Sequence, residues 1–301
     1  MKQKVKDAVM ASFIADALSL GVHWVYDAAA IKDRYGRLET MVAPELAPYH
    51  STKEKGRFTH YGDQALVLLE SVVAAKGFDL NHFSTSWQSL FKNYAGYVDG
   101  ATQETLKNIE ADASVNPSGS VSTDLGGAAR IAPLALFYHT DAEAFERSAS
   151  AQTAMTHNQK IVIDIARYFA WVAYRVFDGD NPVPALEASV DNIPDAPRVQ
   201  QMVTAGIESR DQDTGGAIGR FGQMCAAENA LPSAIHLIAK YEDNLKDALV
   251  ENIMAGGDSS ARGMLAGFII GAYQGLDRIP GSWLDDLQAG ERIAELTAGI
   301  S

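Results

Sequence analysis

The chain has 301 residues, of which 47% are hydrophobic and 21% are charged, a composition typical of a globular protein with a large buried core. Its net charge of −13 repels nucleic-acid phosphates and anionic membranes, so we expect no nucleic-acid partner and no membrane association. The lone cysteine, Cys225, cannot form an internal disulfide, which favours a reducing compartment, the cytoplasm. Asp16 interrupts the N-terminal apolar stretch, so no signal peptide is expected there.

Apolar residues recur at steps of three and four along most of the chain, the spacing of an amphipathic helix. The faces with this spacing begin at Val5, Leu66, Ile161, Ile235 and Leu245. Because strand-like alternation is scarce and no linker marks a boundary, we predict an all-α fold, with a single compact multi-helix domain over residues 1–301. The longest irregular stretches, near residues 40–62 and 210–222, are expected to be functional loops.

An aspartate stands at the start of each of two helices, Asp63 after Gly62 and Asp258 after Gly257. An N-cap is the ordinary role of such a carboxylate, and the helix dipole keeps it ionised. If the two helix starts converge, the carboxylates are also suited to share a hard cation such as magnesium, which prefers oxygen ligands.

The helix behind Asp258 carries a stripe of glycines at Gly263, Gly267, Gly271 and Gly275. Each glycine inside a helix costs about 1 kcal/mol relative to alanine. A smooth stripe lets another backbone approach closely and regain dispersion contacts. We therefore predict a central helix that is packed on all sides.

Together these motifs resemble those of the ADP-ribosylglycohydrolase family. The matching segments keep the family's order: Ala15-Asp16-Ala17-Leu18-Ser19, Gly62-Asp63-Gln64-Ala65, Gly126 to Leu134, Thr156-His157, Gly256 to Ala261, Ile279-Pro280 and Trp283. The resemblance implies an all-helical fold of this type. It also implies hydrolysis of the bond between ADP-ribose and an acceptor, at a two-magnesium cluster held between helix starts.

The residues at the family's metal positions depart from its pattern. The family uses Thr, Asp and Asp early and Asp, Asp and Thr late; the matching places here are Gly62, Asp63, Gln64, Asp258, Ser260 and Ala261. Two carboxylates cannot balance the four positive charges of two magnesium ions. We therefore expect one Mg²⁺ ion or none, with Asp63, Asp258 and Ser260 as ligands. The pattern is similar to that of the branch that contains jellyfish lens crystallins.

Two charged residues on helices need partners if they are buried. Arg262 lies one turn behind Asp258, and we hypothesise that its guanidinium occupies part of the cation space and pairs with Asp63 or Asp258. The alternative is an arginine on the helix surface. Asp16 lies on an otherwise apolar helix, and Arg130 is its expected partner.

Other residues receive candidate roles around the expected cleft. The candidate catalytic residues are Asp63, Asp258 and His23, the last as a general base because the pKa of histidine lies near neutrality. The candidate substrate-binding residues are Tyr61, Gln64, Arg130, His157, Gly257 and Arg262. A structural role is the alternative for His23 and His157, and an ordinary core position is the alternative for Tyr61. Cys225 is expected to be a small buried apolar residue.

We favour a hydrolase that cleaves an ADP-ribosyl or related N- or O-glycosyl bond in a small-molecule substrate, with a degenerate magnesium site. A non-catalytic ADP-ribose- or nucleotide-binding protein is one alternative, because helix N-termini favour phosphate. A structural protein like the lens crystallins is another. Hydrolysis requires Asp63 and Asp258, whereas a binding protein holds its ligand without metal and a structural protein does neither. The sequence makes no prediction about oligomeric state.

Overall fold

Helices account for the regular elements in the computed structural model of the chain, which describes residues 2–112 and 118–300. The first half contains α1 (Lys2–Ser19), α2 (Ala28–Tyr35), η1 (Pro48–His50), α3 (His60–Ala75), α4 (Leu80–Phe91), α5 (Gly100–Ala111), α6 (Gly126–Ala129), η2 (Ala132–Leu134), α7 (Ala135–Tyr138) and α8 (Ala142–Thr156). The second half contains α9 (Lys160–Asp178), α10 (Pro182–Ser189), η3 (Val190–Asn192), α11 (Pro197–Glu208), α12 (Thr214–Phe221), α13 (Ala227–Lys240), α14 (Leu245–Met254), α15 (Ser259–Gln274), α16 (Gly281–Asp286) and α17 (Gly290–Ala298).

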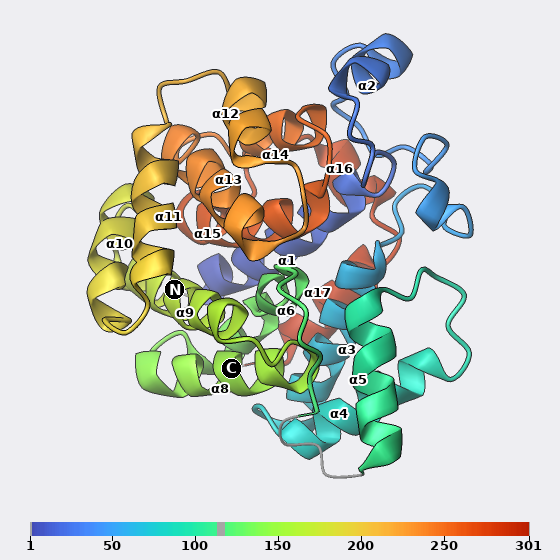
Figure 1. Ribbon diagram of the computed structural model, residues 1–301, viewed down its shortest axis with the longest axis vertical. Helices are drawn as coiled ribbons and strands as arrows, with labels where there is room; N and C mark the ends of the chain where they lie inside the picture. Colours follow the sequence, from blue (N-terminus) through green and yellow to red (C-terminus); the bar gives the residue numbers. More distant parts are fainter. Residues whose placement is uncertain (1, 113–117, 301) are drawn as a thin grey trace.

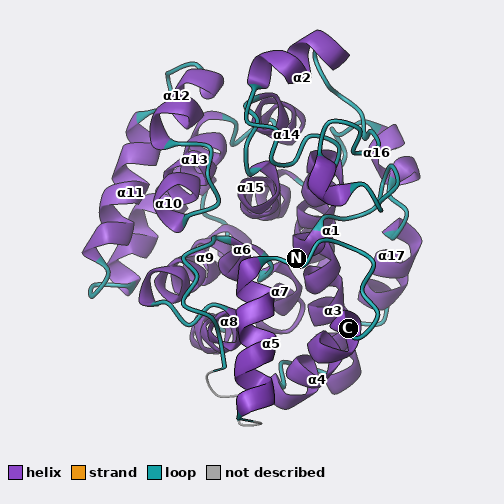
Figure 2. Ribbon diagram, turned by 45° about the vertical axis from the view of Figure 1, so that its right-hand side comes forward, coloured by secondary structure: helices purple, strands orange, loops and turns teal. Residues whose placement is uncertain are grey.

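In these two ranges the β pairing is limited to isolated bridges, and the ribbon consists of helices joined by loops (Figure 2). The prediction of an all-α fold in one compact domain is therefore confirmed. None of the helices described is long and apolar enough to cross a membrane.

Helices α1 and α15 pack against each other in the middle of the molecule, and the other helices surround them (Figure 1). Every residue of α15 from Ser259 to Ala272 is buried. The glycine stripe faces α1: a Cβ on Gly267 would lie 2.7 Å from the carbonyl oxygen of Ala11, and a Cβ on Gly271 would lie 2.6 Å from the Cβ of Ala11. The glycines thus allow the expected close approach of two backbones, which fixes the position of the α15 N-terminus.

Replacing Gly267 with alanine is expected to lower the free energy of unfolding by about 1–3 kcal/mol, because the added methyl group overlaps the Ala11 carbonyl. In an unobstructed helix the same change stabilises by up to about 1 kcal/mol. Gly219 of α12 provides the matched control, since a Cβ there meets no atom within 4 Å. Chemical denaturation measures the free energy of unfolding of both variants, which should fall for Gly267→Ala and rise for Gly219→Ala. A Gly267→Ala protein as stable as Gly219→Ala would contradict the close packing of α1 and α15.

The loop expected over residues 210–222 is not wholly irregular. Thr214–Phe221 form α12, and the Asp213 carboxylate caps it by accepting a hydrogen bond from the Gly216 N–H at 2.8 Å. The glycines in this segment suggested a loop, but the cap and the buried Ile218 stabilise a short helix.

The two expected aspartate caps have different outcomes. Asp258 caps α15 as predicted, accepting from the Ala261 N–H at 3.3 Å. Asp63 does not cap α3, because that helix begins three residues earlier, and its N-cap is Thr59, whose hydroxyl accepts from the Tyr61 N–H at 3.1 Å. The start of α3 therefore presents a different set of side chains from the one expected.

Candidate functional site

Hydroxyl groups at the starts of α3 and α15 meet on one buried carboxylate. Asp16 of α1 accepts from the Thr59 hydroxyl at 2.6 Å, from the Thr59 N–H at 2.9 Å and from the Ser260 hydroxyl. The Thr59 and Ser260 oxygens lie 3.2 Å apart. Burial raises the pKa of Asp16 to about 6, although these hydrogen bonds act in the opposite direction. The two helix starts therefore converge, with the Asp16 carboxylate between them.

Tyr61, the second residue of α3, joins two further carboxylates. Its hydroxyl oxygen lies 3.0 and 2.8 Å from the two oxygens of Asp124 and 3.1 Å from an oxygen of Asp258. Tyr61 is 1% exposed and Asp258 is fully buried. A phenol has one hydrogen to donate, so Tyr61 can donate to only one of the two carboxylates at a time.

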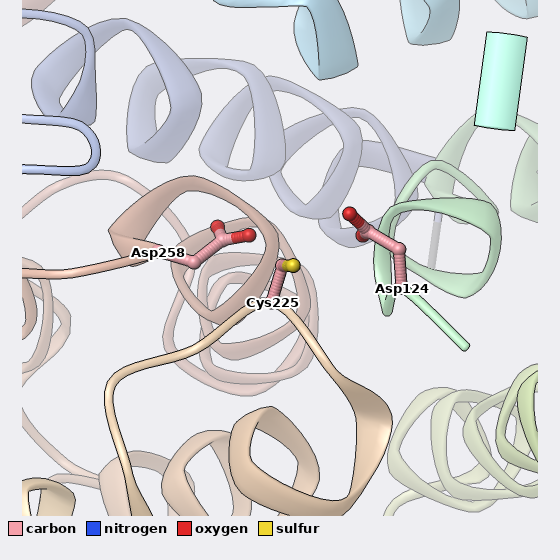
Figure 3. A group of neighbouring side chains, drawn as sticks. All are labelled: Asp124, Cys225 and Asp258. Atoms are coloured by element: carbon pink, nitrogen blue, oxygen red, sulfur yellow. The ribbon is translucent and has the colours of Figure 1, made fainter. Parts of the chain in front are cut away.

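The loop before α13 fixes Asp124, Cys225 and Asp258 relative to one another. The Leu125 N–H donates to the Cys225 carbonyl at 2.9 Å, and the Asp258 N–H donates to the Gln223 carbonyl at 2.8 Å. The carboxyl groups of Asp124 and Asp258 point from two sides toward the Cys225 sulfur (Figure 3). One ligand atom from each of the three residues lies within 4.8 Å of the other two. This cluster, Asp124–Cys225–Asp258, is the one in the described residues with the donor atoms and spacing to hold an ion.

The groups of the Asp124–Cys225–Asp258 cluster resist losing their protons. Burial raises the pKa of Asp124, and the charge of Asp258 raises it further. Burial also raises the pKa of Asp258, although the charge of Arg262 lowers it. The pKa of the Cys225 thiol is raised by burial and then by the two carboxylates. Crowded negative charge of this kind favours a positive partner, either a proton or a cation.

A group of buried histidines adjoins this cluster. The Nδ1 atom of His23 lies 4.0 Å from an Asp258 oxygen. Burial lowers the pKa of His23 well below its ordinary value, and His50 and His60 lower it further, so the ring is neutral. The ring centroids of His23 and Trp24 lie 4.5 Å apart, and those of His23 and His50 lie 5.1 Å apart. His23 thus lies beside the Asp258 carboxylate as a neutral ring, with one N–H and one lone pair that have no hydrogen-bond partner among the described residues.

Buried polar atoms without a hydrogen-bond partner are concentrated around the two helix starts. They include both ring nitrogens of His23 and His50, Nε1 of Trp24, Nε2 of His157, Oγ of Ser259 and Nη1 of Arg262. Trp24 also has a φ of +64°, a strained value for a residue other than glycine. Most buried polar groups in proteins are satisfied, so these atoms have hydrogen-bonding capacity that is free for a polar ligand or ordered water.

Aromatic side chains extend from these histidines to solvent. Trp24 contacts Tyr49 and Tyr97, with ring centroids 5.2 and 5.1 Å away. Tyr49 is 50% exposed, and Tyr26 is 42% exposed. Burial, followed by the charge of Asp258, raises the pKa of Tyr26.

Asp63 lies apart from the cluster. Its carboxylate pairs with the ammonium group of Lys53 and accepts from the Tyr94 hydroxyl. Its side chain is 18% exposed. One helical turn beyond the start of α3, Asp63 therefore has a cation and a donor already, and it is not among the residues that gather around Asp258.

The expected pairing of Asp16 with Arg130 is wrong. Arg130 is buried and donates to Gln64 Oε1 at 3.0 Å, to Gln152 Oε1 at 2.8 Å and to the Thr156 hydroxyl. The buried Gln64 amide belongs to the same network: its Nε2 donates to the His60 carbonyl, and its Oε1 also accepts from Nε1 of Trp87. Neutral amide and hydroxyl acceptors thus satisfy Arg130, and the two helix starts satisfy the Asp16 carboxylate.

Arg262 differs from both of its expected environments. It is fully buried, which rules out the surface position, and it donates to Asn252 Oδ1 at 3.2 Å and to the Gly256 carbonyl at 2.7 Å. These oxygens orient the guanidinium away from a direct ion pair, so the expected contact with Asp63 or Asp258 is wrong. Its charge nevertheless lowers the pKa of Asp258. Arg262 therefore places a positive charge behind Asp258 and braces the turn that leads into α15.

Gly257 occupies a conformation that most residues avoid. Its φ is +70°, and a Cβ there would lie 2.4 Å from the Gln223 carbonyl oxygen. Its N–H donates to the Val25 carbonyl at 2.8 Å, and its carbonyl accepts from the Trp24 N–H at 2.9 Å. The glycine is thus required so that the strained Trp24 segment and the start of α15 can pack together.

Known proteins resemble the chain along almost its whole length. The family model described as ADP-ribosylglycohydrolase matches residues 1–300. The chain belongs to the ADP-ribosylglycohydrolase family. Crystallin J1A of Tripedalia cystophora is 24% identical over 319 residues, which cover 100% of this chain and 97% of that one. ADP-ribosylhydrolase ARH3 of Mus musculus is 22% identical, with 93% and 86% of the two chains covered.

A solved structure confirms that the fold is shared with ADP-ribosylglycohydrolase relatives. It is titled "ADP-ribosylglycohydrolase-related protein complex" and superposes with a TM-score of 0.76 over 98% of this chain and 96% of that chain. The sequence identity is 21%. At that identity the comparison supports the fold alone.

The donor set does not fit the two-magnesium cluster implied by the ADP-ribosylglycohydrolase family. The facing helix starts carry Thr59, His60 and Tyr61 on α3 and Asp258, Ser259 and Ser260 on α15, so one carboxylate stands among six side chains. The Thr59 and Ser260 hydroxyls are already bound to Asp16. The additional donors beside Asp258 are the Asp124 carboxylate and the Cys225 thiol, and magnesium disfavours the thiol.

Sequence reasoning missed three members of this site. Asp124 and Cys225 lie in irregular segments joined by an isolated bridge, and no periodicity relates them. Cys225 is half-buried beside two carboxylates, so the expected apolar environment is wrong. Thr59 did carry a signal, because threonine is a favoured N-cap and lies directly before the buried His60 and Tyr61.

Proposed function

We propose that the chain is a hydrolase that cleaves a glycosyl bond of an ADP-ribosyl or related compound at the start of α15. One observation carries the proposal: Asp258, Tyr61 and Asp124 come together from three separate segments of an ADP-ribosylglycohydrolase fold. Unpartnered buried polar atoms surround them. The similarity to ADP-ribosylhydrolase ARH3 supports an ADP-ribosyl group as the substrate class.

Asp258 and His23 take the central roles in this proposal. Glycosyl hydrolysis passes through a transition state with positive charge on the sugar, which a nearby carboxylate stabilises. Asp258 supplies that carboxylate. His23, neutral and with Nδ1 4.0 Å from an Asp258 oxygen, accepts a proton from the attacking water as general base, and its lowered pKa makes it a weaker base than the sequence suggested. The N-termini of α3 and α15 provide a favourable field for the phosphates of the ligand.

We align the family's early metal positions with the start of α3, and not with Gly62-Asp63-Gln64, the segment matched from the sequence. We place Thr59, His60 and Tyr61 at the positions of Thr, Asp and Asp, so that neither early aspartate survives in this chain. Asp63 then supports the fold through Lys53 instead of holding an ion. The expected Mg²⁺ is thereby reduced to one weakly held ion at Asp258 and Ser260, or to none.

Ligand recognition falls to the atoms that the fold leaves free. Nη1 of Arg262 and Nε2 of His157 are buried and unpartnered, which suits them to phosphate or ribose oxygens. The side-chain atoms of Gln64 and Arg130 are engaged with each other, so these residues support the site from behind. A small-molecule ADP-ribosyl ligand, no nucleic-acid partner and a cytoplasmic location complete the proposal.

Release of free ADP-ribose from peptides ADP-ribosylated on arginine or serine tests this function. Wild-type protein is expected to release ADP-ribose from at least one acceptor, at a rate that added magnesium changes less than about tenfold. Failure with every acceptor, together with tight binding of ADP-ribose, would instead support the non-catalytic binding protein. Strict dependence on magnesium would contradict the assignment of the α3 residues.

A structural role is the second candidate. The similarity to Crystallin J1A covers the whole chain, and a net charge of −13 favours high solubility. A chain that neither binds nor hydrolyses ADP-ribosyl compounds would support this role.

A further inference from the structure

The hydrogen-bond donors to the carboxylates of the Asp124–Cys225–Asp258 cluster are neutral groups: the Tyr61 hydroxyl and the N–H groups of Gly126 and Ala261. The single hydrogen of the Tyr61 hydroxyl serves only one of the two carboxylates that it contacts. The Cys225 sulfur lies between those carboxylates, and one ligand atom from each residue falls within 4.8 Å of the others. Three groups that become anionic on deprotonation therefore face a common point.

His23 gives an independent indication that a ligand occupies this point. It is fully buried, neither ring nitrogen has a hydrogen-bond partner, and Nδ1 lies 4.0 Å from the Asp258 carboxylate. A buried imidazole without a partner is costly. A cation, or a water bound to one, next to Asp258 would give this imidazole the partner that the protein does not provide.

The backbone holds the cluster ready for an ion. The loop that carries Cys225 is hydrogen-bonded to the Asp124 segment through Leu125 and to the Asp258 segment through Gln223. The three donors thus come from segments that are tied to one another and do not depend on a flexible side chain reaching across the site. Such preorganisation lowers the ordering cost of binding.

The donor types decide which ion fits. Carboxylate oxygen and thiolate sulfur together, with imidazole nearby, are ligands of zinc and similar borderline cations. Magnesium takes oxygen ligands and leaves a thiol unused. Zinc sites that take part in catalysis use three protein ligands and keep a fourth position open.

We propose that Asp124, Cys225 and Asp258 bind one divalent cation of the zinc type. This site has the same location as the proposed active site, but it does not require that the protein hydrolyses ADP-ribosyl compounds. Ligand atoms lie about 2.0–2.3 Å from zinc, so the cluster closes by roughly 1 Å on binding. The Cys225 thiol releases its proton to solvent and becomes a thiolate. Three anionic ligands exceed the ion's charge by one, and the buried Arg262 behind Asp258 balances the excess.

Cobalt titration of the full-length, chelator-treated protein tests the site directly. Cobalt(II) substitutes for zinc and gives a thiolate-to-metal charge-transfer band in the near ultraviolet. We expect one cobalt per chain with this band, displaced by one equivalent of zinc and unaffected by millimolar magnesium. Absence of binding, or displacement by magnesium as readily as by zinc, would overturn the proposal whether or not the protein hydrolyses ADP-ribosyl compounds.

Two variants separate ligation from adventitious binding. Cys225→Ser is expected to abolish the charge-transfer band and to weaken cobalt binding more than about 100-fold, because even outer-shell losses cost about 10–100-fold. Asp195→Asn is the control, since Asp195 pairs with Lys160 and its side chain is 59% exposed. Circular dichroism checks that both remain folded. Equal cobalt affinity in Cys225→Ser and the control would overturn the proposal.

Discussion

Asp258→Asn is expected to lower the rate of ADP-ribose release by about 10²–10⁴-fold, the range for removing a group that acts directly in proton transfer and charge stabilisation. The amide has the size of the carboxylate but carries no charge. Asparagine is also a good N-cap, so the hydrogen bond to the Ala261 N–H can persist and α15 should form normally. The measurement is the release assay at saturating peptide, with thermal unfolding as the check on folding.

Asp63→Asn is the matched comparison. Asp63 lies at the start of the helix that faces Asp258, but its carboxylate is bound by Lys53 and Tyr94. We expect its loss to reduce the rate less than about tenfold and to act mainly on stability. If Asp63→Asn were as impaired as Asp258→Asn, the site would be centred on both aspartates, and the assignment of Asp63 to a supporting role would be wrong.

His50→Phe is expected to make the protein more resistant to acid. His50 is fully buried, and burial, followed by the charges of His60 and Lys53, lowers its pKa to about 3. In the unfolded chain a histidine titrates near about 6.5. As the pH falls below that value the unfolded state binds the proton first, so His50 costs stability between about pH 6.5 and pH 3, at roughly 1.4 kcal/mol per pH unit.

Phenylalanine cannot be protonated and fits a position that already contacts Trp24 and Tyr97. The free energy of unfolding of His50→Phe minus that of wild type should therefore rise by about 2–3 kcal/mol between pH 7 and about pH 4.5. Urea denaturation at several pH values measures this difference. His139→Phe is the control, because His139 is half-buried and bonded to the Ala135 carbonyl. A pH-independent difference for His50→Phe would show that His50 is not buried as a neutral ring.

The fold was predictable because its physical causes are local. Apolar spacing marks the buried faces of helices, and the glycine stripe from Gly263 to Gly271 predicted the close contact with another backbone that α1 provides. The Asp258 cap was predictable for the same reason, since a capping residue acts on the N–H groups that directly follow it. The short helix α12 was missed because three glycines outweighed its cap and its few apolar residues.

Only the site residues that lie at the start of a helix could be predicted from the sequence. Asp124 and Cys225 are about 100 residues apart and meet through a loop whose path has no sequence period. The N-cap of α3 was misplaced by four residues because Asp63 matched the chemistry of the family motif, whereas the cap is Thr59 and the buried residues of the helix begin at His60. Partners of buried charges were also missed: Asp16 and Arg130 each find neutral donors or acceptors that sequence spacing does not reveal.

A calorimetric titration of ADP-ribose into the wild-type protein, with and without added magnesium, most directly tests the claim that the buried centre around Asp258 recognises an ADP-ribosyl group without a magnesium pair. We predict binding of one ADP-ribose per chain in both conditions, with affinities within about threefold of each other. The Asp258→Asn protein serves as the check that the heat arises at this centre. Binding that appears only when magnesium is added, or no binding in either condition, would contradict the claim.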